Sequence, residues 1–141
     1  MYAFLCTARP RSVNAKRTDK YQEQIRQAFW KYCRLADLLR EPLYGIAYYF
    51  HAEHNQLDAD NLSKPIWDAL EGLAYQDDSV VQLRHSGIID LRQTDLTVFD
   101  LSQMPDNVAN DVVAFVAAEK HIIYVEFGSL KPEMFVFGCS E

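Results

Sequence analysis

The chain lacks the features of several common protein classes. No apolar run reaches the roughly 18 residues that a membrane-spanning helix requires. The apolar stretch at its start is too short for a secretory signal and has no basic segment before it. We therefore expect a cytoplasmic protein without a membrane partner.

Cysteine is scarce, and several sequence signatures of enzymes are missing. The three cysteines are widely spaced and form no CxxC pair, which predicts reduced thiols rather than a disulfide framework or a zinc site. The sequence also has no glycine-rich phosphate loop and no GxSxG motif. Any catalytic chemistry must therefore come from other residues.

The charge of the chain is unevenly distributed. Its 141 residues are 49% hydrophobic, which predicts one globular domain over residues 1–141. The net charge is -6, but residues 1–40 carry +6 and residues 41–141 carry -12. The N-terminal part is therefore the part suited to face a polyanion.

Hydrophobic periodicity predicts an α+β fold with a mixed sheet and two or three helices. Strands are expected at residues 2–7, 43–51, 96–99, 122–127 and 134–137, and another is expected to begin at residues 80–83. The first helix is expected over residues 18–40, with Thr18 or Asp19 as its N-cap and Pro42 after its end. Because Pro65 fits best in a first turn, a second helix is expected to begin near Asn61 or Lys64. A third is expected to be capped by Asp106 or Asn107.

Acidic residues gather between the predicted strand at 43–51 and the strand that begins at residue 80. Asp58 and Asp60 are two residues apart, so in extended backbone they share one face and can hold the same ion. Lys64 follows one helical turn later, and the chain then returns through Asp77 and Asp78. Carboxylate oxygens are ligands that Mg²⁺ prefers, so these acids predict a magnesium site.

A second interpretation of the same residues needs no metal. Asp58, Asp60 and Asn61 are typical turn and capping residues, and Lys64 and Asp68 can form a solvated i,i+4 pair. The joint pattern is more specific, because DxDN, the lysine, DAL and DD occur in fixed order.

Residues 58–81, with the sequence DADNLSKPIWDALEGLAYQDDSVV, closely resemble the signature of RusA-type Holliday junction resolvases of bacteria and their prophages. A weaker likeness lies in residues 10–14, and the match covers about residues 1–85, with residues 100–141 as a divergent extension of the same domain. The resemblance implies a homodimeric α+β endonuclease that resolves four-way DNA junctions in recombination and repair by paired strand nicks.

The resemblance also implies roles for individual residues. Asp58, Asp60 and Asp78 would bind Mg²⁺ as catalytic acids, and Lys64 would assist at the scissile phosphate. Asp77 and Asn61 would support the metal ligands. Arg84 and Arg92 are both candidates for a basic residue on the strand after the acid pair.

A basic loop near the N-terminus is suited to backbone phosphates, because ion pairing there is independent of sequence. The loop contains Arg9, Arg11, Lys16, Arg17 and Lys20, and the residues expected to bind DNA are Arg9, Arg11, Asn14, Lys16 and Arg17. The plainer interpretation is a solubilising loop. Two other functions stay open: a noncatalytic module that binds junctions or a protein, and a metal-dependent hydrolase of a smaller phosphoester.

Overall fold

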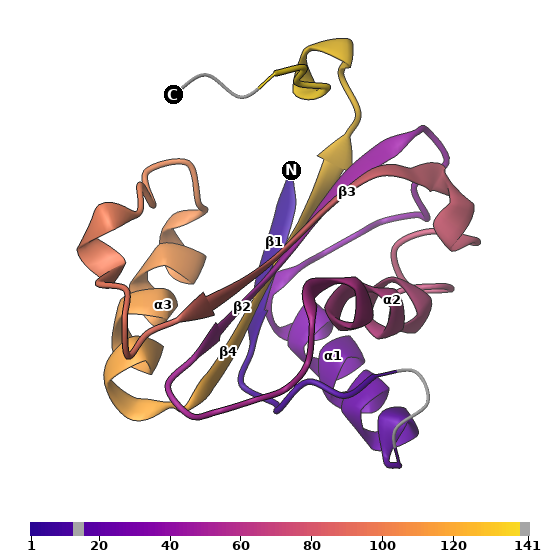
Figure 1. Cartoon of the computed structure of the whole chain (residues 1–141). Coiled ribbons are helices and arrows are strands. Elements are labelled where there is room, and N and C mark those ends of the chain that lie inside the picture. Colours follow the sequence, from indigo (N-terminus) through magenta and orange to yellow (C-terminus); the bar gives the residue numbers. More distant parts are fainter. Residues whose placement is uncertain (13–15, 139–141) are drawn as a thin grey trace.

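The computed structural model describes residues 1–12 and 16–138 (Figure 1). Its strands are β1 (Tyr2–Cys6), β2 (Leu43–His51), β3 (Val81–Asp90) and β4 (His121–Ser129). Its α-helices are α1 (Thr18–Tyr32), α2 (Ala59–Ala69) and α3 (Asp106–Ala118).

The four strands form one mixed sheet in the order β1-β4-β2-β3. β4 is antiparallel to both of its neighbours, whereas β2 and β3 are parallel and are joined by a crossover through α2. The predicted α+β class and the single domain are therefore confirmed. The crossover matters for function, because every residue of the acidic signature lies on it or at the start of β3.

The helices cover both faces of the sheet (Figure 1). α1 and α2 pack on one face, where aromatic residues such as Phe29, Tyr49 and Trp67 are buried. α3 packs on the other face through Val108 and Val112. α2 contacts α1 beside it and both β2 and β3 of the sheet, so the crossover is supported on two sides.

Both termini of α1 differ from expectation. Its N-cap is Arg17, in the left-handed conformation with φ 67° and without a side-chain cap, rather than Thr18 or Asp19. The helix ends at Tyr32 and not at residue 40, because Cys33 is extended while its N–H still donates to Phe29. The chain beyond it then forms a bridge from Leu39 to Tyr75, which a continuous helix would not reach.

α2 begins at Ala59, earlier than predicted, and Pro65 lies inside it rather than in its first turn. Likewise, Pro105 rather than Asp106 or Asn107 is the N-cap of α3. The two cysteines within the described residues, Cys6 and Cys33, are free and buried, as expected for reduced thiols.

Two predicted strands are wrong. Residues 96–98 form a 3₁₀ turn, because the Asp95 carboxylate accepts the Thr97 N–H and closes a local turn. Residues 132–134 form another 3₁₀ turn, and Phe135 to Phe137 are exposed and pair with none of the strands in the described part of the chain. By contrast, the strand expected to begin at residues 80–83 is confirmed as β3, and it extends to Asp90 because it pairs with β2 along the whole length of β2. Within the described residues, no helix has the length and apolar character needed to span a bilayer.

Candidate active site

The acidic signature begins at the N-terminus of α2. Asp58 is the N-cap, and its Oδ1 accepts the N–H of Asn61 at 2.9 Å. Asp60 follows in the first turn, where the positive end of the helix dipole favours a carboxylate. Ser86 on β3 donates to the carbonyl oxygen of Ala59 at 2.7 Å, which ties this end of α2 to the sheet. Asp58 and Asp60 are both exposed, so an incoming ligand can reach them.

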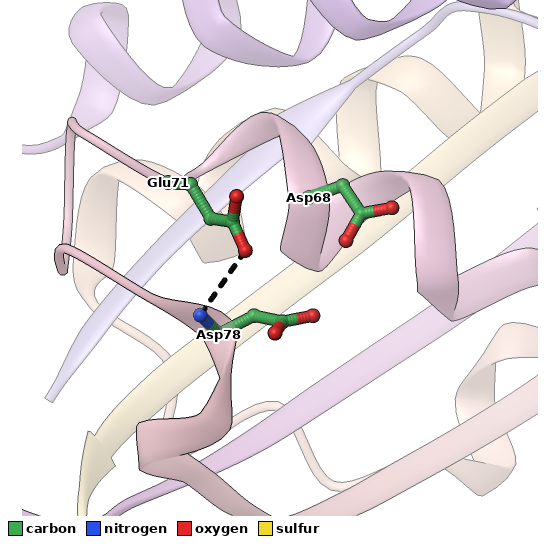
Figure 2. A group of neighbouring side chains, drawn as sticks. All are labelled: Asp68, Glu71 and Asp78. Carbon is green, nitrogen blue, oxygen red and sulfur yellow. Dashed lines mark hydrogen bonds between the residues drawn. The ribbon is translucent and has the colours of Figure 1, made fainter.

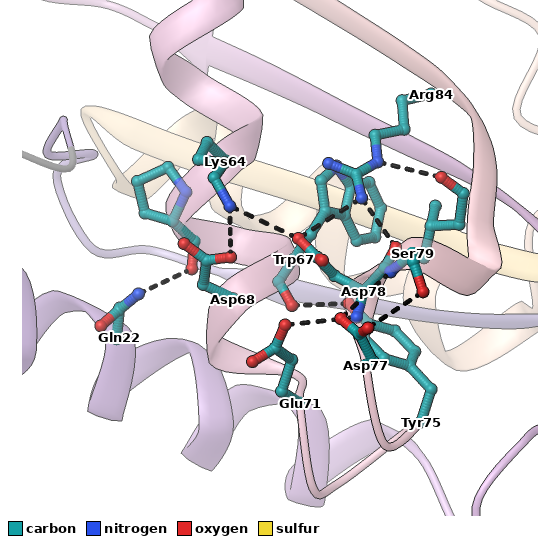
Figure 3. A network of polar contacts seen from close by, with 12 residues as sticks. Gln22, Lys64, Trp67, Asp68, Glu71, Tyr75, Asp77, Asp78, Ser79 and Arg84 are labelled. Carbon is teal, nitrogen blue, oxygen red and sulfur yellow. Dashed lines mark hydrogen bonds and ion pairs between the residues drawn. The ribbon is translucent and has the colours of Figure 1, made fainter.

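One stripe of α2 then carries alternating charges. Asp60, Lys64 and Asp68 are each four residues apart and so share one face of the helix. Nζ of Lys64 lies 2.8 Å from Oδ1 of Asp68 and 3.5 Å from Oδ2 of Asp78 (Figure 3). Lys64 therefore joins α2 to the start of the next strand.

Asp78 lies in a short 3₁₀ turn, Asp78–Val80, that leads directly into β3. Asp77 is the N-cap of this turn, and its carboxylate accepts from the backbone N–H and the hydroxyl of Ser79. The N–H of Asp78 donates to Oε1 of Glu71 at 3.2 Å. Arg84 lies 3.4 Å from the Asp78 carboxylate, so Asp78 faces two cations.

Three carboxylates meet at this point. Oxygen atoms of Asp68, Glu71 and Asp78 all lie within 4.8 Å of one another and can hold a cation (Figure 2). No other such trio occurs within residues 1–12 and 16–138, and this one does not include Asp58 or Asp60. Asp60 and Asp68 are eight positions apart on α2, which corresponds to about 12 Å along the helix axis. Lys64 lies between these two ends.

The cations shift the ionisation of the site. Burial raises the pKa of the Asp78 carboxyl, but Lys64 and Arg84 outweigh this effect and hold the pKa below its ordinary value. The hydrogen bond to Asp68 and the charges of both acids raise the pKa of Lys64. Asp78 is therefore a carboxylate and Lys64 an ammonium at neutral pH.

The donor set suits a hard divalent cation such as Mg²⁺, since it consists of carboxylate oxygens. Protein cations already pair with Asp68 and Asp78. No ion pair to Asp58 or Asp60 is found in the described part of the chain. The first turn of α2 therefore has more uncompensated negative charge than the trio does.

The predicted DNA-binding residues are partly brought together. Arg9, Arg11 and Arg17 line one small pocket together with Lys20, another residue of the basic loop. Lys16 is exposed next to Arg17. Asn14 lies outside the described residues.

Sequence reasoning missed one residue of the acidic site and left the basic residue after the acid pair undecided. Glu71 has no local signal, because its contact with Asp78 depends on a chain reversal at Gly72, where φ is +83°. Of the two basic candidates after the acid pair, Arg84 faces Asp78, whereas Arg92 pairs with Asp90.

Comparison with known proteins finds a family match over the segment that carries this site. The family model for the endodeoxyribonuclease RusA matches residues 6–87, from the end of β1 into β3. This range spans the basic loop, the whole crossover and the Asp78 turn. No curated protein matches the chain. Because the family model covers more than half of its 141 residues, the chain belongs to the RusA endodeoxyribonuclease family.

Proposed function

We propose that this protein is a magnesium-dependent endodeoxyribonuclease that resolves four-way DNA junctions as a homodimer, by paired strand nicks. The observation that carries the proposal is the contact of Lys64 with Asp78, which joins two parts of the family signature 14 residues apart. It lies inside the range that the family model matches.

In this proposal Asp58, Asp60 and Asp78 hold the metal. The capping bond of Asp58 engages Oδ1, and within the described residues Oδ2 has no hydrogen-bond donor. Asp60 is exposed. Bound Mg²⁺ would polarise the scissile phosphate and favour attack by water. Arg84 would hold the turn that carries Asp78 through the Asp78 carbonyl oxygen, and the Asp78 carboxylate would serve as a metal ligand.

The other residues of the site stabilise charge at the phosphate or position the proposed metal ligands. Lys64 offsets the negative charge that develops at the attacked phosphate, a role that suits an ammonium with a raised pKa. Asn61 fixes Asp58 through its N–H, and Asp77 stabilises the turn that carries Asp78. No covalent intermediate with the enzyme is expected.

The test is cleavage of a labelled synthetic four-way junction with and without Mg²⁺. The wild type should nick the junction only with the metal, and Asp60→Asn or Asp78→Asn should abolish nicking while junction binding persists. Asp106→Asn is a matched control, since Asp106 is an exposed acid on α3, on the other face of the sheet. Undiminished cutting by both site variants would overturn the assignment.

The same assay separates the other functions. Junction binding without nicking by the wild type would favour a noncatalytic module. Hydrolysis of nucleotides with no affinity for junctions would favour a phosphoesterase. Asp68→Asn distinguishes the two possible metal sets, because it removes a member of the Asp68, Glu71 and Asp78 trio and leaves Asp58 and Asp60 intact.

A further inference from the structure

The loop of residues 52–58 joins the end of β2 to α2 and places Asp58 at the start of the acidic signature (Figure 1). Asp58 itself is exposed, whereas Leu57 before it packs against the core. Of residues 54–57, only Asn55 forms a side-chain hydrogen bond to a strand of the sheet within the described part of the chain. The position of the loop before Asp58 therefore depends largely on Asn55.

Asn55 forms hydrogen bonds in two directions. Its Oδ1 accepts the N–H of Leu57 at 2.9 Å, and its Nδ2 donates to the hydroxyl of Tyr49 at 3.1 Å. Because a backbone N–H can only donate, the bond from Leu57 fixes which end of the amide is the oxygen. The amide therefore links the backbone one residue before Asp58 to a side chain of β2. Tyr49 is fully buried, so this bond is costly to lose.

The hydroxyl of Tyr49 accepts from Asn55, so its own hydrogen needs an acceptor. Nδ1 of His121, on β4, lies 2.7 Å from the hydroxyl oxygen, and the two rings are stacked. Burial is the main cause that lowers the pKa of His121, so the imidazole is uncharged at neutral pH. A neutral imidazole that accepts at Nδ1 carries its hydrogen on Nε2, and Nε2 lies 3.6 Å from Oε1 of Glu53. Donors and acceptors therefore match along the whole chain from Asn55 to His121.

We propose that Asn55 and Tyr49 are positioning residues for the metal site, which hold the loop so that the Asp58 carboxylate meets Mg²⁺, and that His121 fixes the direction of the Tyr49 hydroxyl. The inference rests on the proposed function for the role of Asp58 as a metal ligand, but not for the chain of hydrogen bonds. Partners that orient a metal ligand change metal affinity when they are lost. The proposal adds residues of β2 and β4 to a site otherwise built from α2 and the turn before β3.

The first experiment titrates the full chain with Mg²⁺ in the absence of DNA and follows the amide NMR signals in the first turn of α2. Tyr49→Phe keeps the ring and removes only the hydroxyl. This variant and Asn55→Ala should each weaken Mg²⁺ binding by about tenfold, the lower end of the range for outer partners of a metal ligand. The double variant should bind no more weakly than either single variant, because both residues act through one chain.

Tyr44→Phe is the matched control for this titration. Tyr44 also lies on β2, but its hydroxyl donates to Glu126 at 2.6 Å and not to the loop. The control variant also loses a tyrosine hydrogen bond, so it should lower the urea midpoint while Mg²⁺ affinity stays at the wild-type value. This comparison separates positioning of Asp58 from general stability.

The second experiment needs no metal and measures amide hydrogen exchange at Leu57. Exchange should be faster in Asn55→Ala, which loses the acceptor, and in Tyr49→Phe, which releases the amide from the sheet. It should stay unchanged in Tyr44→Phe. In the wild type, the ¹⁵N signals of the His121 ring should show the hydrogen on Nε2, and a hydrogen on Nδ1 would overturn the assigned direction of the Tyr49 hydroxyl.

The outcomes separate this inference from the proposed function. Equal Mg²⁺ affinity in the wild type, Tyr49→Phe and Asn55→Ala would overturn the positioning role and leave the nuclease assignment intact. Additive losses in the double variant would overturn the single chain. By contrast, an absence of Mg²⁺ binding by the wild type, or unchanged binding by Asp58→Asn, would overturn Asp58 as a metal ligand and the positioning role with it. Asn caps a helix about as well as Asp, so Asp58→Asn keeps the start of α2.

Discussion

Arg84 contacts Asp78 through both backbone and side chain. Its Nη2 donates to the carbonyl oxygen of Asp78 at 2.7 Å and lies 3.4 Å from Oδ2 of the same residue. Its Nε donates to the carbonyl oxygen of Val81 at 3.1 Å. The Arg84 guanidinium therefore connects the turn before β3 to the strand itself. It also fixes the backbone position from which the Asp78 side chain extends.

Arg84→Gln should weaken the response to magnesium. Because Arg84 orients a proposed metal ligand, its loss should raise the Mg²⁺ concentration needed for half-maximal cleavage by about 10 to 100-fold. Arg84→Lys should restore little, since an ammonium cannot form three contacts in fixed planar geometry. Arg92→Gln, at the other end of β3, is the control. An unchanged Mg²⁺ titration of Arg84→Gln would contradict the positioning role.

Lys64→Gln should impair the chemical step more than DNA binding. Loss of one preorganised charge typically lowers kcat by about 10² to 10³-fold, whereas affinity for the junction should change little. Single-turnover cleavage and binding in EDTA measure the two effects separately. A loss of junction affinity as large as the loss in rate would place Lys64 in binding instead.

Lys64→Gln should also shift the pH dependence of junction cleavage. Lys64 is one of two cations that lower the pKa of Asp78, so its removal should raise that pKa. A metal ligand must be ionised, and the acid limb of the cleavage profile should therefore move to higher pH. An acid limb at the wild-type position would show that Asp78 does not control it.

The site was predictable where its geometry is local. The four-residue spacing of Asp60, Lys64 and Asp68 places them on one helix face whatever the rest of the chain does. Glu71 could not be found in this way, because its contact with Asp78 depends on the reversal at Gly72.

The strands, too, could be predicted only where the local sequence decides them. β2 was predicted with its observed bounds because its residues have strong strand propensity. Only the beginning of β3 was predicted, at residues 80–83, since β3 is an edge strand whose polar residues, such as Arg84 and His85, hide the apolar alternation. The apolar residues 134–137 have strand propensity but no strand beside them. Propensity alone therefore cannot decide such segments.

Gly45→Ala should destabilise the crossover. A Cβ at Gly45 would lie 2.6 Å from Cη2 of Trp67 and 2.9 Å from Cγ1 of Val81, and Trp67 is fully buried. Overpacking of this kind costs about 1–3 kcal/mol, which should appear as a lower urea midpoint. Gly87→Ala is the matched control, since its Cβ would meet only the partly exposed Tyr48 ring at 3.1 Å. Equal midpoints for the two variants would contradict the close packing of Trp67 on β2.

Acidification should destabilise the protein through His121. Burial is the main cause that lowers the pKa of His121, and Arg9 and His51 lower it further while Glu53 opposes them. The unfolded chain therefore binds a proton at a higher pH than the folded one, near the ordinary value of 6.5. Stability linked to this group is full above that pH and falls as the pH drops through it.

The measurement is the free energy of unfolding at about pH 7.5 and about pH 5.5, on either side of the histidine range. The decrease should be smaller in His121→Gln than in the wild type, and unchanged in His85→Gln, whose side chain is exposed. The lowered pKa values of Glu53 and Asp78 act at lower pH, below their ordinary values of 4.5 and 3.8. Protonation of Glu53 and Asp78 therefore does not contribute to the stability change measured across the histidine range. An equal decrease in the wild type and His121→Gln would show that another group controls stability there.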